Sequence, residues 1–429
     1  MRVLLTGATG FIGSAILTRL QRQGHEVIGV TRRRGAATER LRPHGWIELD
    51  LGRTTTAAAW RGRLTGVDAV VNCAGVLQDG GGDTTLGVHR DGPAALFEAC
   101  QEAGVRKVIQ ISAIGADLDA PTEFQRTKAL GDAELKRRAL EWIILRPAIV
   151  LGPAAYGGSA LIRSLASLPF LPRIHGTGTL QFVQVDDVAE TVARLLEAGA
   201  WSQTTLDLAA PETFTFDEVV ALYRRWLGHA PTRRIGGGRL LPFVFRLGDI
   251  AGLLGWRPPV RTTARRELER GVSGDGTAWM TATGVKPQSL EYALASRPAS
   301  VQERWFATLY LLKPLLIGGL SLFWIVTALI AAGPAFRPAQ QLMADAGAHV
   351  LAVPATWLGI AADLAVGIGL AFRRSARAAL WAGIMVSFAY LLGGTLLSPG
   401  LWVDPLGPLT KILPVVLLHL ACLAILDDR

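Results

Sequence analysis

A chain of 429 residues, half of them apolar and with a mean hydropathy of +0.32, is too long for one ordinary domain and too apolar for a typical soluble protein. No nucleic-acid-binding motif accompanies its formal charge of +9. We therefore interpret the charge as the basic bias of cytoplasmic loops in a membrane protein, and expect no nucleic-acid partner. The three cysteines, Cys73, Cys100 and Cys422, lack metal or redox spacing, so we expect no bound metal.

The first 210 residues alternate short apolar runs with helical patterns. The apolar runs are rich in Val and Ile and do not alternate with polar residues, as is typical of strands buried on both faces. Such alternation of strands and helices predicts an α/β fold, a Rossmann-type doubly wound parallel sheet. We expect strands at 2–7, 26–32, 68–75, 107–113 and 141–147, and helices at 11–24 and 92–105.

A glycine-rich turn joins the first expected strand to the first helix. Residues 6–13 are TGATGFIG, and this T-G-x-x-G-x-x-G pattern lies in the strand–turn–helix context that a dinucleotide site needs. Gly7 would permit the tight turn, Gly10 a close approach of the backbone to a pyrophosphate, and Gly13 close helix–strand packing. The candidate cofactor-binding residues here are Thr6, Gly7, Thr9, Gly10, Phe11, Ile12 and Gly13.

The second expected strand ends in Thr31, which is followed by Arg32, Arg33 and Arg34. A site for NAD usually offers an acidic residue here to the ribose hydroxyls, whereas guanidinium groups suit the 2′-phosphate of NADP. The sequence therefore favours NADP(H) over NAD(H), with Arg32 and Arg33 as the candidate contacts.

The composition changes after about Arg304. Four apolar segments follow, each about as long as a bilayer-spanning helix, which predicts an all-α four-helix transmembrane domain. We divide the chain into a nucleotide-binding domain at 1–230, a less regular substrate-side region and linker at 231–304, and a membrane domain at 305–429. Within residues 211–300 a helix is expected at 215–228, with Thr215 and Glu218 as a capping box. The apolar segments are 308–332, 350–372, 378–397 and 409–426.

Basic residues are unevenly distributed among the loops between these segments. The loop between the second and third segments carries Arg373, Arg374 and Arg377, and the other two loops are poorer in Lys and Arg. The positive-inside rule then places this loop, the C-terminus and residues 1–304 in the cytoplasm. We expect a multi-pass protein of the cell's inner (cytoplasmic) membrane.

Several motifs together resemble those of extended and atypical short-chain dehydrogenases/reductases. The most similar group contains the NADPH-binding accessory subunit of respiratory complex I. Residues 305–429 resemble the DoxX-like four-helix membrane family, by pattern rather than by a sharp motif. The motifs are, in chain order, TGATGFIG (6–13), LDL (49–51), NCAG (72–75), QISAIGA (110–116), F-x-x-x-K (124–128), LRPAIVLGP (145–153) and VQVDDVAE (183–190).

The resemblance implies roles for further residues. Ser112 would occupy the place of the catalytic serine and Lys128 that of the catalytic lysine, which also holds the cofactor's ribose. Two residues depart from the family pattern, because Phe124 replaces the usual tyrosine and Gln184 stands where histidine is common. Residues that would line the cofactor are Asp50, Leu51, Asn72, Cys73, Ala74 and Gly75, while Arg146 and Pro147 would lead into the substrate loop.

Phe124 leaves the proton donor open, because a phenyl ring cannot supply a proton. The protein could bind NADPH without turnover, or it could reduce an acceptor, such as a quinone, that needs little acid help. Alternatively another group gives the proton, and the candidates are Tyr156, Ser112 and water. Tyr156 lies in the loop expected to cover the substrate, where ordinary packing is the competing interpretation.

The sequence thus predicts a membrane-anchored, NADPH-dependent oxidoreductase acting on a lipophilic carbonyl or quinone. The alternative is a non-catalytic NADPH-binding sensor or an assembly factor for a membrane complex, which would have a membrane protein as its partner. Two ionisable residues, Asp363 and His419, fall inside apolar segments and are candidates for function or for helix–helix hydrogen bonds.

Overall fold

The computed structural model describes residues 1–429 except 81, 173, 175, 198–200, 237–240 and 428–429. The chain forms two compact units. The first unit consists of Met1–Asp249 and Pro258–Ala307, and the second of Ile250–Arg257 and Thr308–Arg429.

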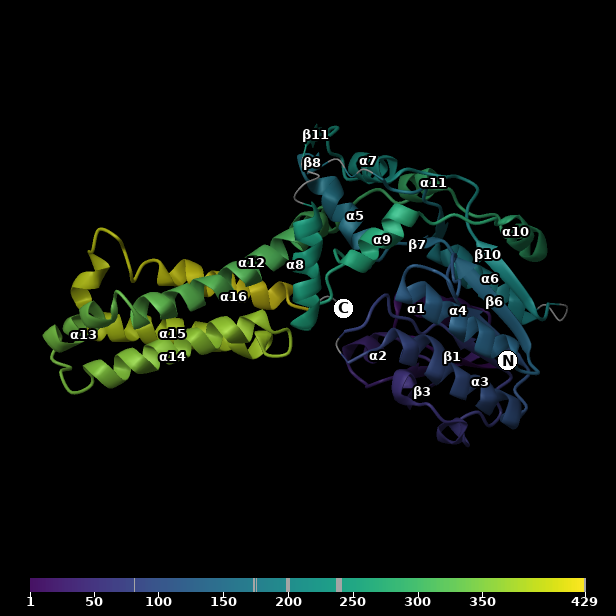
Figure 1. Ribbon diagram of the computed structural model, residues 1–429, viewed down its shortest axis with the longest axis horizontal. Helices are drawn as coiled ribbons and strands as arrows, with labels where there is room; N and C mark the ends of the chain where they lie inside the picture. Colours follow the sequence, from purple (N-terminus) through teal and green to yellow (C-terminus); the bar gives the residue numbers. More distant parts are fainter. Residues whose placement is uncertain (81, 173, 175, 198–200, 237–240, 428–429) are drawn as a thin grey trace. The chain divides into compact units, whose positions relative to one another are not determined.

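A seven-stranded parallel sheet forms the centre of the first unit and confirms the doubly wound fold. The strand order is β10-β6-β5-β4-β1-β2-β3, so successive strands run outward in opposite directions from β1 and β4. Ligands of such sheets bind outside the carboxyl ends of the strands at this reversal. The strands are β1 (Arg2–Thr6), β2 (Glu26–Thr31), β3 (Gly45–Glu48), β4 (Ala69–Asn72), β5 (Lys107–Ile111), β6 (Glu141–Pro147) and β10 (Thr204–Leu208) (Figure 1).

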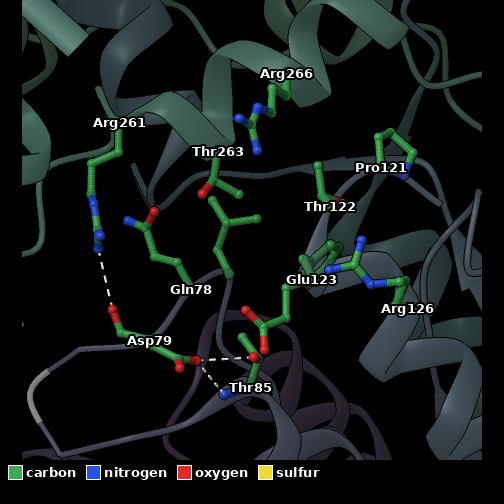
Figure 2. A pocket seen from close by; sticks show the side chains of 12 residues that line it. Gln78, Asp79, Thr85, Pro121, Thr122, Glu123, Arg126, Arg261, Thr263 and Arg266 are labelled. Carbon is green, nitrogen blue, oxygen red and sulfur yellow. Dashed lines mark hydrogen bonds between the residues drawn. The ribbon is translucent and has the colours of Figure 1, made fainter. Parts of the chain in front are cut away.

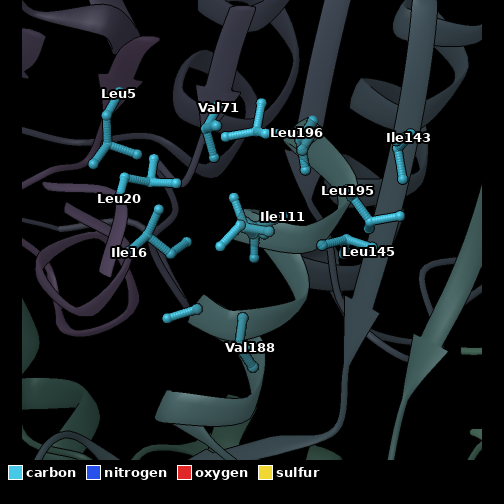
Figure 3. Packing of buried hydrophobic residues seen from close by; sticks show 14 of the residues in the cluster. Leu5, Ile16, Leu20, Val71, Ile111, Ile143, Leu145, Val188, Leu195 and Leu196 are labelled. Carbon is cyan, nitrogen blue, oxygen red and sulfur yellow. The ribbon is translucent and has the colours of Figure 1, made fainter. Parts of the chain in front are cut away.

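Both faces of this sheet are buried, which explains why its inner strands are apolar throughout. Leu4, Val70 and Val108 pack with α3 (Gly92–Ala103) and α4 (Glu123–Lys136) on one face. Their sequence neighbours pack on the other face with α1 (Phe11–Arg22) and α6 (Val185–Glu197). Figure 3 shows this second layer, in which Leu5, Val71, Ile111 and Leu145 lie near Ile16, Leu20, Val188 and Leu195. Each such side chain contributes about 1.5–3 kcal/mol on burial.

A smaller layer completes the first unit. Two pairs of short strands run in parallel: β7 (Ile149–Leu151) with β9 (Phe182–Gln184), and β8 (Phe170–Pro172) with β11 (Arg233–Ile235). The predicted capping box is confirmed, because the hydroxyl of Thr215 accepts from the Glu218 amide and the Glu218 carboxylate accepts from the Thr215 amide. The helices of this layer are α5 (Gly158–Ser167), α7 (Phe216–Trp226), α9 (Thr262–Arg270), α10 (Thr277–Thr283) and α11 (Leu290–Ala295).

The second unit is helical. Among the described residues, three helices are long and apolar enough to cross a membrane: α12 (Val301–Ala332), α14 (Ala352–Ala371) and α15 (Ala376–Leu397). The fourth expected segment forms α16 (Ile412–Ile425), an apolar helix of 14 residues that is shorter than the roughly 20 residues a bilayer core requires. A short helix, α13 (Phe336–Asp345), follows α12 and was not predicted.

Candidate cofactor and active site

The glycine turn between β1 and α1 leaves no room for side chains. Gly7 has a φ of +62°, and a Cβ on it would lie 2.8 Å from the carbonyl group of Cys73. A Cβ on Gly13 would collide with the carbonyl oxygen of Gly7. Gly10 precedes the first helical residue, Phe11, so the free N–H groups of α1 begin directly after the turn. The turn is therefore a backbone-lined cradle at a helix N-terminus, a geometry that suits a pyrophosphate.

Buried polar side chains join the strand ends at the point where the strand order reverses. The hydroxyl of Thr6 donates to Asn72 Oδ1, and Asn72 Nδ2 donates to Gln110 Oε1 at 2.7 Å. Thr6 is the last residue of β1, Asn72 is the last residue of β4, and Gln110 lies within β5. Each of the three is at most 1% exposed. Thr6 and Asn72 thus fix the floor of the cradle through their side chains, and Gln110 is a member of this group that sequence reasoning missed.

The basic residues that follow β2 have different surroundings. Arg32 pairs with the carboxylate of Asp83, which is itself buried. The side chain of Arg33 is exposed, and its carbonyl oxygen accepts a hydrogen bond from the Thr31 hydroxyl at 3.0 Å. Asp50 caps the short turn after β3 by accepting from the Gly52 amide at 3.2 Å, whereas Leu51 is buried in the core.

Lys128 lies beneath the loop that follows β4. Its Nζ donates to the carbonyl oxygen of Ile111 at 3.0 Å, and a Cβ on Gly75 would lie 3.2 Å from the same nitrogen. Burial lowers the pKa of Lys128 to about 8, an effect opposed by Asp132 and Cys73. Burial also raises the pKa of the Cys73 thiol to about 12, so Cys73 is neutral at physiological pH. The structure therefore brings Lys128 together with Cys73 and Gly75, which lie far from it in sequence.

A buried carboxylate that the sequence analysis missed connects Ser112 to Arg146. Asp132 Oδ2 accepts from the hydroxyl of Ser112 at 2.9 Å and from Arg146 Nη2 at 3.0 Å. Burial raises the pKa of the Asp132 carboxyl, and the guanidinium of Arg146 opposes that shift. Among the described atoms, Asp132 Oδ1 has no hydrogen-bond partner. Asp132 lies one turn after Lys128 on α4, so one helix face carries both charges.

Phe124 lies one turn before Lys128, in apolar contact with a histidine. Its ring centroid is 5.6 Å from that of His89, edge to face. His89 Nε2 accepts from the Val76 amide at 3.0 Å and Nδ1 lies 2.9 Å from the Thr127 hydroxyl, so both ring nitrogens are engaged. Burial lowers the pKa of His89 to about 2. His89 is therefore a neutral residue that fixes the loop after β4, and cannot replace the missing tyrosine as an acid.

A pocket of about 260 Å³ lies beside Phe124 (Figure 2). Arg261 crosses its edge and donates to the carbonyl oxygen of Asp79 at 3.2 Å, while its Nε lies 3.2 Å from the carboxylate of Asp249. The Glu267 carboxylate ties α9 to the start of α4. The lining comes from the loop after β4 (Leu77, Gln78, Asp79, Thr85), the start of α4 (Pro121, Thr122, Glu123, Phe124, Arg126) and α9 with its preceding residue (Arg261, Thr263, Arg266).

Tyr156 lies against the first residue of α1. Its ring stacks on that of Phe11, with centroids 5.7 Å apart and planes 13° from parallel. Arg163 holds the same loop by donating to the carbonyl oxygens of Gly152 and Pro153 and by pairing with Glu303 at 2.7 Å. Tyr156 thus covers the glycine turn, and its role as a proton donor stays a prediction.

The two ionisable residues predicted to lie inside apolar segments, Asp363 and His419, make hydrogen bonds between helices. Asp363 on α14 accepts from the Tyr390 hydroxyl on α15 at 2.7 Å. His419 on α16 accepts from Trp324 Nε1 on α12 at 3.0 Å and lies 2.7 Å from the Val415 carbonyl oxygen. These contacts support a packing role for both residues.

Comparisons with known proteins separate the same two parts of the chain. Residues 3–205 match the family described as the NAD dependent epimerase/dehydratase family, and residues 321–420 match the DoxX-like family. Sterol demethylase protein B of Methylococcus capsulatus is 25% identical over 71% of this chain and 99% of its own length. The mitochondrial NADH-ubiquinone oxidoreductase 40 kDa subunit of Neurospora crassa is 28% identical over 51% of this chain and 58% of its own length. These matches confirm the resemblance stated from the motifs.

An uncharacterized protein of Mycobacterium tuberculosis is 28% identical over 52% of this chain, and the match covers only 23% of that longer protein. Among solved structures, UDP-glucuronic acid 4-epimerase from Bacillus cereus, in complex with UDP-glucuronic acid and NAD, has a TM-score of 0.52 at 20% identity. The likeness covers 72% of this chain and all of that one. At this identity it shows a shared fold.

Proposed function

We propose that this chain, which joins an epimerase/dehydratase-type NAD-binding domain to a DoxX-like membrane domain, is an NADPH-dependent reductase of a lipophilic carbonyl or quinone. The observation that carries the proposal is the buried Lys128, held beneath residues 73–75 at the end of the sheet where such cofactors bind. A buried lysine whose pKa is lowered by burial is costly to keep, which favours a functional role over a structural one.

The residues at the end of the sheet fit a nicotinamide dinucleotide. The cradle of Gly7, Gly10 and Gly13 and the N-terminus of α1 would hold the pyrophosphate, and Lys128 would hold the ribose beside the nicotinamide. Asp50, Cys73, Ala74 and Gly75 would line the rest, whereas the side chain of Leu51 is buried in the core. The cofactor supplies the hydride when bound, and the residues of the chain supply orientation and the proton.

Preference for NADPH rests on Arg32 and Arg33. The exposed guanidinium of Arg33 is available to a 2′-phosphate, whereas the guanidinium of Arg32 already pairs with the buried carboxylate of Asp83. We therefore assign the larger part of the phosphate contact to Arg33. The Arg33→Ala variant should raise the Kd for NADPH about tenfold or more and leave that for NADH unchanged, as measured by titration calorimetry.

Ser112 is our first candidate for the residue that contacts the substrate oxygen. Its hydroxyl hydrogen bonds to the buried Asp132, which is fixed by Arg146, so the serine is held in one orientation near Lys128. Ser112 has one hydroxyl hydrogen and donates it to Asp132, so it would donate to a substrate oxygen only after the hydroxyl turns away from Asp132 as hydride reaches the carbon, with water as the final proton source. Tyr156 remains a second candidate, and Tyr156→Phe tests it: unaltered turnover would remove it from consideration.

The lipophilic character of the substrate is supported by the membrane domain and by one relative. A reductase tethered to a bilayer has a high effective concentration near substrates dissolved there. The relative whose length this chain spans almost completely is named for the demethylation of sterols, which are lipids. The basic end of the helical unit, with Lys313, Arg373 and Arg377, supports an inner membrane location with this end and the nucleotide-binding unit in the cytoplasm.

The test is NADPH oxidation by the purified full-length protein in detergent or nanodiscs, with panels of sterol ketones, long-chain carbonyls and quinones. Turnover that requires a lipophilic acceptor and falls in Ser112→Ala supports the proposal. Tight NADPH binding with no turnover on any acceptor would favour a sensor or assembly factor of a membrane complex. Phe124 supports that alternative, because it stands where the usual acid, a tyrosine, is expected.

A further inference from the structure

Helix α8 (Leu241–Leu253) exposes an apolar face that no described element covers. Phe243, Leu247 and Ile250 follow one another at helical spacing and form one stripe, with Val244 and Leu253 at its sides. These five side chains are between 44% and 84% exposed. Single exposed apolar residues are ordinary, but a contiguous stripe on one helix marks an interaction surface.

The opposite face of α8 is packed, so the stripe cannot simply turn inward. A Cβ on Gly248 would collide with the carbonyl oxygen of Val260, which shows how closely the backbones approach. The carboxylate of Asp249 accepts from the Thr262 amide at 3.2 Å, from the Thr262 hydroxyl and from Arg261 Nε. These contacts fix the rotation of the helix about its axis and leave the apolar stripe outward.

The residues that follow α8 are bound to the end of the apolar helices. The Arg373 amide donates to the Leu254 carbonyl oxygen at 3.0 Å, and Trp256 Nε1 donates to the carbonyl oxygen of Ala371 at 2.8 Å. Ala371 is the last residue of α14, and Arg373 lies in the turn before α15. The Arg373 guanidinium lies 5.5 Å from the centre of the Trp256 ring. Tryptophan and arginine at the end of apolar helices are typical of the boundary between hydrocarbon and headgroups.

Positive charge is concentrated at this same boundary. Lys313 Nζ donates to the carbonyl oxygen of Leu426 at 3.0 Å, and Arg373 and Arg377 both pair with Asp427. Arg246 lies exposed on α8 beside the apolar stripe. An apolar helix face with basic residues beside it matches the surface of an anionic bilayer, where the long arginine stem can reach the headgroups.

We propose that the apolar stripe of α8 is buried in the lipid bilayer, with the helix lying in the plane of the membrane surface. The occupant is lipid, because α8 leads directly into Trp256, which is anchored where the membrane-spanning helices α14 and α15 end. The same helix, through Asp249, holds the start of α9, whose residues Thr263 and Arg266 line the pocket. One wall of the pocket is thereby connected to a helix embedded in the membrane surface.

The test places a spin label on the stripe of the full-length protein in nanodiscs of zwitterionic and anionic phospholipid. Phe243→Cys, Leu247→Cys and Ile250→Cys report on the stripe, and Leu118→Cys, at 56% exposure in the first unit, is the matched control. The wild-type chain, labelled in the same way, gives the background from the native cysteines. Accessibility is measured by power saturation with oxygen, which partitions into lipid, and with a water-soluble nickel chelate.

The three stripe labels should be more accessible to oxygen than to nickel and lie about 5–10 Å below the phosphates, whereas the Leu118→Cys label should show the reverse. Nickel accessibility equal to that of the control would overturn the proposal. Protection from both reagents with spin–spin broadening would also overturn it, because a second copy of the chain would then cover the stripe. Because three positions are labelled separately, one variant that fails to fold leaves two to decide the outcome.

Discussion

The two ends of α4 differ in how they are built. The end that carries Lys128 and Asp132 is buried and polar, and it is held from within the sheet by Ile111, Ser112 and Arg146. The end that carries Phe124 is apolar, opens onto a pocket and is held by α9 through Glu267. The cofactor-side machinery is thus fixed by the core of the unit, whereas the substrate side is formed by an added layer that can change independently.

The largest expected effect comes from removing the Asp132 carboxylate at the buried, polar end of α4. Asp132→Ala should lower the free energy of unfolding by about 3 kcal/mol, because it leaves Arg146 unpaired and removes the acceptor of Ser112. Thermal denaturation of the full-length protein, followed by near-ultraviolet circular dichroism, measures the loss. Asp132→Asn is the matched control and should cost much less, because an amide oxygen still accepts one hydrogen bond. Equal melting temperatures for Asp132→Ala and wild type would show that the core does not depend on this network.

Introducing a phenol at the apolar end of α4, in place of the Phe124 ring, should give the next largest effect, a gain in activity. Phe124→Tyr should raise carbonyl reduction about 100-fold, the usual contribution of a positioned acid, because Lys128 lies one turn away to lower the phenol pKa. Turnover with a long-chain ketone measures the gain. The double variant Phe124→Tyr with Lys128→Met should lose it, since the phenol would then lack its cationic neighbour. No gain in the single variant would mean that the substrate does not reach this end of α4.

The pH dependence of cofactor binding isolates Lys128. Burial sets its pKa at about 8, below the ordinary value of 10.5, so the unfolded chain holds more protons between these values and the apoprotein gains stability as pH rises through them. Cofactor binding uses the charged form, so the Kd for NADPH should rise by up to about tenfold per pH unit above 8. Fluorescence titrations between neutral and alkaline pH measure this slope. A slope that persists in Lys128→Met would assign it to another group.

The cofactor side was largely predictable from sequence, for a physical reason. Buried parallel strands must be apolar on both faces, and the glycine turn between the first strand and α1 has a fixed spacing, so both leave a local pattern. The edge strands β3 and β10 were missed because their runs are short and mixed in polarity. Helix α9 was missed for a similar reason, since its sequence TTARRELER has no apolar stripe.

The long-range contacts of the site could not be predicted on either side, because they join residues that are distant in sequence. Asp132 meets Arg146 only after β6 takes its place beside β5, and Tyr156 stacks on Phe11 although the two residues are far apart in sequence. The resemblance placed Ser112 and Lys128 but gave no indication that Asp132 lies between the serine and Arg146. Such pairs follow from topology and leave no local pattern.

The smallest expected effect tests whether the two ends of α4 are independent. Glu267 accepts from the Thr122 hydroxyl and from Gln125 Nε2 at 2.7 Å, so it holds α9, and with it the pocket residues Thr263 and Arg266, on the start of α4. Glu267→Gln cannot accept both hydrogen bonds equally, and we expect a loss of about 1 kcal/mol in the free energy of unfolding. The KM for a lipophilic acceptor should rise several-fold because the pocket wall is loosened.

The Kd for NADPH should stay within about twofold of wild type in the same variant, because Lys128 keeps its contacts with Ile111 and the loop after β4. Glu269→Gln, two residues further along α9 on an exposed side chain that pairs with Arg265, is the matched control and should change neither quantity. A parallel loss of NADPH affinity in Glu267→Gln would show that α4 responds as one rigid element. In that case the substrate layer could not vary without disturbing the cofactor site.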